Sequence, residues 1–154
     1  MATGAVTALH GSTSSTVNFG SIIGSSFTIC SVTRYTGGNK RRILDGLGRN
    51  WLHGHWSGNA GVAHYDGWKT TVRDNVSPDT NWVVMCGTNA GSQLKLVNGQ
   101  SVATANGGVG GCGLRINSGY GMPGEASDFV GDGGGETFGR SRSATAFAAF
   151  HFPC

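Results

Sequence analysis

The chain has 154 residues and a formal net charge of +3, and charged residues make up 12% of it, about half the usual share. This length fits one domain; 28 glycines against 3 prolines exclude a coiled coil, and the low charge excludes a disordered polyelectrolyte. Basic residues are scattered apart from Lys40-Arg41-Arg42, and no apolar run approaches the roughly 20 residues of a membrane span, so we expect no nucleic-acid partner and no membrane span.

The apolar runs are short, rich in β-branched residues and separated by glycine-containing turns, without helical periodicity. Two hairpins are predicted, and the second, closed by Asn98-Gly99, has the strongest turn signal. In chain order, the expected strands cover residues 17–19, 27–34, 42–44, 51–56, 62–65, 68–72, 82–86, 93–97, 100–103 and 114–117, the hairpins being 51–56 with 62–65 and 93–97 with 100–103. About ten short strands predict an all-β fold, an antiparallel two-sheet sandwich.

The pattern changes after residue 129. Residues 131–135 are nearly all glycine, and the remainder is Ser, Arg, Ala and Phe without clear alternation. We therefore expect a domain over residues 1–129 and an irregular Gly/Ser/Ala-rich tail over residues 130–154.

Four cysteines, Cys30, Cys86, Cys112 and Cys154, are widely spaced and include no Cys-x-x-Cys pair, which argues against a zinc ribbon or a redox motif. Cys30 and Cys86 both lie in expected strands. They could be disulfide-bonded neighbours in one sheet, or they could be small buried thiols.

Several segments follow one another in a distinctive order. They are Ser26-Phe27-Thr28-Ile29, Arg42-Ile43-Leu44, Trp82-Val83-Val84, Gln93-Leu94-Lys95-Leu96-Val97-Asn98-Gly99, Leu114-Arg115-Ile116 and Ser127-Asp128-Phe129. This order resembles the LamG-like, concanavalin A-like lectin and glucanase jelly-roll superfamily over residues 17–129. The resemblance implies a jelly-roll sandwich, with a closing strand that is not visible in the C-terminal end of this chain.

The segment 50–56 is the most unusual part of the sequence. On a strand, Trp51, His53 and His55 share one face, because side chains alternate. An aromatic ring beside imidazoles suits a sugar, whose apolar face stacks on the ring while its hydroxyls seek directional partners. The predicted ligand-binding residues are Asn50, Trp51, His53, His55, Tyr65 and Trp68, with His64 and Asp66 close in sequence. The alternative is that the tryptophans are core rings and the histidines structural.

A metal site is a further alternative, since His53 and His55 point the same way and could share an ion with Asp45, His64 or Asp66. The resemblance also implies a structural calcium at the sandwich rim. No spacing singles out a set of carboxylates for it. We therefore assign no metal ligand and expect no cofactor.

Glucanases of this superfamily carry two glutamates flanking an aspartate on one strand. Here the two glutamates, Glu125 and Glu136, are eleven residues apart with a glycine run between them, and no Gly-x-Ser-x-Gly motif occurs. The chain is therefore predicted not to be an enzyme.

These features predict a lectin-like, carbohydrate-binding module that is extracellular or at the cell surface. Asn75-Val76-Ser77 is a glycosylation sequon in the expected loop 73–81, although no secretory signal is visible at the start of the chain. The alternative function is a structural or protein-interaction domain of an extracellular assembly, in which another chain completes the sheet. Exposure of Trp51 distinguishes the two, because a core ring cannot stack on a sugar.

Overall fold

A computed structural model describes residues 15–36, 40–91 and 94–117, together with the backbone of residues 147–150. Within these residues the chain forms ten strands and no helix. The strands are β1 (Val17–Asn18), β2 (Thr28–Thr33), β3 (Leu44–Leu47), β4 (Trp51–Trp56), β5 (Asn59–Tyr65), β6 (Val83–Thr88), β7 (Lys95–Val97), β8 (Gln100–Ser101), β9 (Gly113–Ile116) and β10 (Phe147–Phe150).

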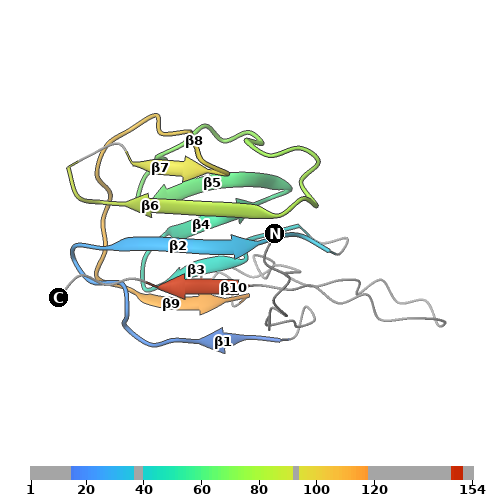
Figure 1. The fold of residues 1–154 in the computed structure, drawn as a ribbon. Coiled ribbons are helices and arrows are strands. Elements are labelled where there is room, and N and C mark those ends of the chain that lie inside the picture. The colour runs from blue at the N-terminus through green and yellow to red at the C-terminus, as the bar shows by residue number, and fades with distance from the viewer. Residues whose placement is uncertain (1–14, 37–39, 92–93, 118–146, 151–154) are drawn as a thin grey trace, which may run out of the picture.

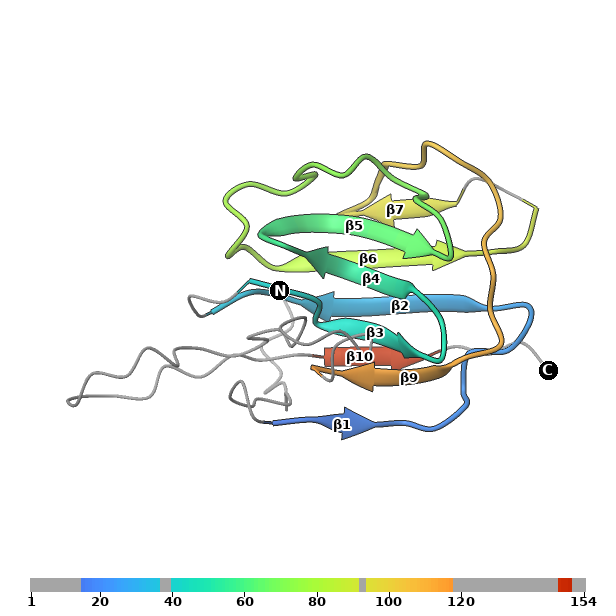
Figure 2. The ribbon, with the colours of Figure 1, turned by 180° about the vertical axis from the view of Figure 1, so that it is seen from behind.

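The strands form two antiparallel five-stranded sheets. The first sheet has the order β1-β9-β3-β4-β5 and the second the order β10-β2-β6-β7-β8. In Figure 1 the second sheet lies in front, and Figure 2 shows the first sheet from the opposite side. The prediction of an all-β, two-sheet antiparallel sandwich is confirmed. No helix in the described part of the chain is long and apolar enough to cross a membrane.

Both predicted hairpins are present, as β4–β5 and β7–β8. Asn98 and Gly99 have φ values of 48° and 83°, the left-handed conformation that a tight two-residue hairpin turn requires at both central positions. The expected strand 68–72 is instead reduced to two isolated bridges, His64 with Trp68 and Thr70 with Ala103. These bridges connect the edge of the first sheet to the chain beyond β8.

The expected tail contains a strand. Its backbone pairs with β2 from Phe147 opposite Val32 to Phe150 opposite Ile29, so β10 closes one edge of the second sheet. The sequence did not indicate this strand, because main-chain hydrogen bonding needs only an extended chain and not an alternating pattern. The rest of the tail, residues 130–146 and 151–154, lies outside the described residues.

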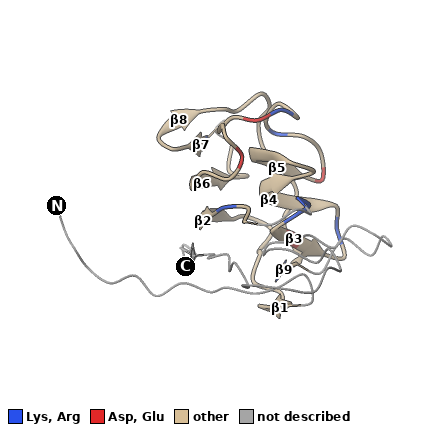
Figure 3. Ribbon diagram, turned by 90° about the vertical axis from the view of Figure 1, so that its right-hand side faces the viewer, with Lys and Arg blue, Asp and Glu red and all other residues tan. Residues whose placement is uncertain are grey.

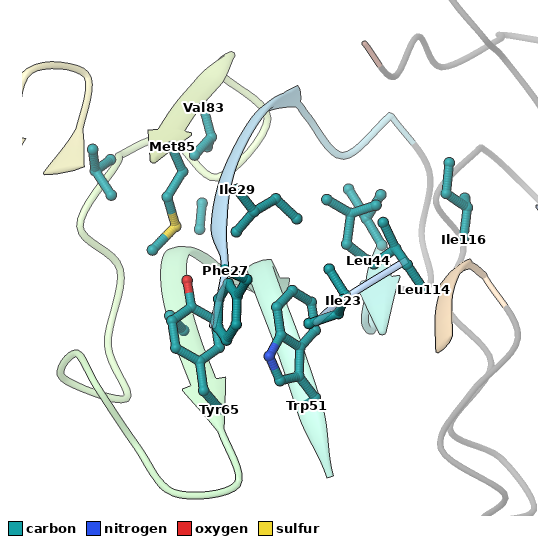
Figure 4. Packing of buried hydrophobic residues seen from close by; sticks show 14 of the residues in the cluster. Ile23, Phe27, Ile29, Leu44, Trp51, Tyr65, Val83, Met85, Leu114 and Ile116 are labelled. Carbon is teal, nitrogen blue, oxygen red and sulfur yellow. The ribbon is translucent and has the colours of Figure 1, made fainter. Parts of the chain in front are cut away.

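Side chains that point between the sheets form a single core. Phe27 lies at its centre, in edge-to-face contact with Trp51 at 5.7 Å and with Tyr65 at 5.0 Å between ring centroids (Figure 4). Ile29 and Met85 of the second sheet pack on the same cluster, and all five side chains are almost completely buried. Aromatic edge-to-face packing contributes to stability beyond the area that it buries.

The disulfide prediction is confirmed for one pair. Cys30 of β2 lies directly opposite Cys86 of β6, and the two form a disulfide across 56 residues of sequence. Cys112 is a buried free thiol, and burial raises its pKa. Cys154 lies outside the described residues.

Candidate functional site

The β4–β5 hairpin carries most of the predicted site. Trp51 pairs with Tyr65 and Leu52 with His64, and directly opposed residues in an antiparallel sheet share a face. Trp51 and Tyr65 therefore point to one side of the hairpin, and Leu52 and His64 to the other. His55 follows the alternation along β4 and lies on the side of Trp51. A register shift between Gly54 and His55 brings Ala60, and not Gly61, opposite His55.

The face with Trp51, His53, His55 and Tyr65 is the interior of the sandwich, because all four side chains are 0% exposed. The prediction that the tryptophan and the histidines share a face is confirmed. That face does not meet solvent: Trp51 stacks on Tyr65 with ring centroids 5.0 Å apart, and the opposite sheet covers both. In the closed sandwich, a sugar does not reach these rings.

His53 bridges the two sheets. Its Nε2 lies 3.2 Å from the carbonyl oxygen of Met85, and its Nδ1 lies 2.7 Å from the Tyr65 hydroxyl. Since a carbonyl only accepts, Nε2 carries the hydrogen and donates, while Nδ1 accepts from the hydroxyl. Burial lowers the pKa of His53 to about 4 and raises that of Tyr65, so both are neutral at pH 7.

The His55 ring has fewer hydrogen bonds than the His53 ring. Its Nδ1 lies 3.1 Å from the Thr33 hydroxyl oxygen, and its ring packs edge-to-face on Tyr35 at 4.5 Å. Nε2 has no hydrogen-bond partner among the described residues. Burial, and then the neighbouring His53, lower the pKa of His55 to about 3. This interior cluster is a neutral structural network.

A second aromatic group lies on the outer surface of the same hairpin, and we call its rings, Trp56, His64 and Trp68, the outer aromatic group. Trp68 meets Trp56 edge-to-face at 5.2 Å and His64 at 5.0 Å between ring centroids, and all three side chains are partly exposed. His64 is held in place by a 2.8 Å hydrogen bond from Nδ1 to the carbonyl oxygen of Asn50. These rings thus have fixed positions and access to solvent.

Polar groups border the outer aromatic group. The Asn50 side-chain oxygen accepts a 2.8 Å hydrogen bond from Arg42, and Arg49 forms an exposed ion pair with Asp66 at 3.4 Å. Elsewhere charged residues are sparse, and most of the ribbon in Figure 3 is tan. Rings with neighbouring amide and charged groups can stack on a ligand and also hydrogen-bond to it.

Of the predicted ligand-binding residues, Asn50 and Trp68 therefore lie at the solvent-facing group, and the other four lie in the core. The sequence-based prediction did not include Trp56 in the site, because it placed the face of the strand that carries Trp51, His53 and His55 in solvent. The signal that could have located it is the apolar pair Trp51 and Tyr65, since two large rings at opposed hairpin positions favour the core.

No group of three or more His, Cys, Asp or Glu in the described part of the chain could hold a metal ion. The interior histidines have other contacts: His53 bonds to Tyr65 and Met85, and His55 to Thr33. Glu125 and Glu136, on which the prediction about glucanase activity rests, lie outside the described residues.

Comparison with protein-family models, with curated protein sequences and with solved structures finds no match to this chain.

Proposed function

We propose that the chain is a lectin-like, carbohydrate-binding module of an extracellular or surface protein, with a concanavalin A-like jelly roll and no catalytic activity. The observation that supports this proposal is the outer aromatic group, in which Trp56, His64 and Trp68 cluster at the surface beside Asn50. The apolar face of a sugar ring stacks on an exposed indole, and its hydroxyls bond to neighbouring polar groups.

The arrangement of the two indoles supports a sugar more than a flat apolar partner. Their planes are inclined by 66°, so the rings form a corner rather than a flat surface. A corner can contact a pyranose on one face and at one edge together, which favours a compact ligand with both apolar and polar sides. The neighbouring Arg49 and Asp66 supply exposed donors and acceptors for its hydroxyls.

The test is binding to a broad glycan panel by the wild type and by the Trp56→Ala and Trp68→Ala variants. Trp82→Ala is the matched control, because Trp82 is 40% exposed and lies just before β6 of the other sheet. We expect each outer-group variant to bind about tenfold more weakly or worse, since removing a stacked ring costs about 1.5 kcal/mol, and the control to bind normally. If the wild type binds no glycan, or if Trp82→Ala alone abolishes binding, this assignment is wrong.

A second candidate function is a structural or protein-interaction domain without a sugar site. It is favoured by the burial of Trp51, since a core ring cannot stack on a sugar, and by exposed apolar side chains at the start of β6. There Trp82 is 40% and Val84 is 47% exposed, with Arg34 lying 5.0 Å over the Trp82 ring. Apolar surface of this kind is typical of protein contacts. Loss of a protein partner in Trp82→Ala, with no glycan bound by the wild type, would support this second function.

A further inference from the structure

Two lysines, Lys69 and Lys95, have no carboxylate partner among the described residues. Lys69 follows β5, and Lys95 begins β7 in the other sheet. The backbone brings them together, because the carbonyl of Lys69 accepts from Thr104 N and that of Lys95 accepts from Val102 N, both at 2.9 Å. The backbones of the two lysines therefore lie on either side of residues 102–104, and the distance between them is about two strand spacings.

Their side chains converge on Gly107 and Gly108. Lys95 Nζ lies 3.4 Å from the carbonyl oxygen of Gly107 and 5.9 Å from the centre of the Tyr65 ring. The stem of Lys69 passes over Gly108, where an added Cβ would stand 3.3 Å from Lys69 Cε and 2.6 Å from Tyr65 Cβ. Lys69 Nζ itself lies toward Gly67, 3.8 Å from where a Cβ on that glycine would stand. Both lysine side chains thus lie against the Gly107-Gly108 pair.

Two cations of the described residues have carboxylate partners: Lys40 is paired with Asp79 at 2.7 Å, and Arg49 with Asp66 at 3.4 Å. Neither Lys69 nor Lys95 forms an ion pair within the described residues. Lys95 is nevertheless 0% exposed, and its ammonium has one long hydrogen bond for three donor hydrogens. Burial, and then the charge of Lys69, lower the pKa of Lys95.

A buried ammonium beside a second ammonium is unfavourable unless an anion is close. We propose that Lys69 and Lys95 form a binding site for an oxyanion, namely a sulfate or carboxylate group. Lys69 is partly exposed and contacts the anion directly, while the positive charge of the buried Lys95 attracts the anion electrostatically. This site uses none of the three rings of the outer aromatic group and does not depend on the proposed carbohydrate site.

The experiment uses inorganic sulfate as the probe. Thermal unfolding of the full chain is followed in sodium sulfate and in sodium chloride at equal ionic strength, and sulfate affinity is measured by calorimetric titration. The variants are Lys69→Gln and Lys95→Met, and the control is Arg73→Gln, which removes one positive charge from an exposed residue. General salt stabilisation acts on all variants alike, whereas a bound anion stabilises only proteins that retain the site.

We expect wild type and Arg73→Gln to bind sulfate, and Lys69→Gln to bind it about tenfold or more weakly, because a charge-assisted hydrogen bond is lost. If Lys95→Met fails to fold, Lys69→Gln still decides the question. Equal sulfate affinity and equal stabilisation in Lys69→Gln and Arg73→Gln would overturn the proposal.

A second arm compares a sulfated polysaccharide with its unsulfated parent. If Lys69→Gln weakens binding of the sulfated polysaccharide but not of its unsulfated parent, the anion is a substituent of a polymer. Lysine-dependent binding of free sulfate, with no preference for the sulfated polymer, would identify it as a small anion. Binding of the neutral polymer that depends on Trp68 and not on Lys69 would support the carbohydrate site separately.

Discussion

Acid should unfold this protein through its interior histidines. His53 and His55 are fully buried, with pKa values of about 4 and about 3, against about 6.5 for an unperturbed histidine. Below pH 6.5 the unfolded chain therefore takes up two protons that the folded chain does not. The stability that these neutral side chains provide is complete above pH 6.5 and is lost progressively as pH falls through the window toward pH 4 and then 3.

The size of the loss follows from proton linkage. Each histidine that is protonated only on unfolding lowers the free energy of unfolding by about 1.4 kcal/mol per pH unit below its unfolded pKa. Between pH 7.5 and pH 5.5, His53 and His55 together should remove about 3 kcal/mol. This figure holds for any folded pKa well below 5.5. It is a large part of the roughly 5–15 kcal/mol that stabilises a typical domain.

The measurement is urea unfolding at pH 7.5 and pH 5.5, where ordinary carboxylates stay ionised in both states. His55→Gln should reduce the difference between the two pH values by about half, to about 1.4 kcal/mol, and the double variant with His53→Gln should lose most of it. Val84→Thr, an exposed change without a titrating group, should keep the wild-type difference. If His55→Gln and the double variant retain the full loss, other groups control the acid response and the reasoning is wrong.

Two further predictions concern the fold. Reducing the Cys30–Cys86 disulfide, or replacing both cysteines with alanine, should lower the free energy of unfolding by about 4 kcal/mol, the chain-entropy value for a loop of 56 residues, as measured by urea unfolding with and without reductant. Gly87→Ala should cost about 1–3 kcal/mol, because its Cβ would collide with the Tyr65 hydroxyl. In a Tyr65→Phe background the cost of Gly87→Ala should be smaller, and an equal cost in both backgrounds would contradict the collision.

Much of the fold could be predicted from local patterns. Alternation in residues 28–33 places Ile29 and Thr33 on one face of the strand, and Asn98-Gly99 specifies a tight turn, because both patterns depend only on neighbouring residues. β10 could not be predicted, since its pairing with β2 depends on backbone hydrogen bonds over a long sequence separation. The expected strand at residues 68–72 was reduced to bridges because it crosses from one sheet toward the other.

The candidate site could be predicted only in part. Alternation along the strand is enough to predict that Trp51, His53 and His55 share one side, because side chains repeat with a period of two. Which side meets water cannot be read from this alternation, since it depends on the sheet that packs on the hairpin. Met85 and Tyr65 give His53 its hydrogen bonds in the interior, so two imidazoles are buried there, while Trp56 and Trp68 remain at the surface. A strand with polar side chains on one face therefore does not reveal its exposed side until the partners of those side chains are known.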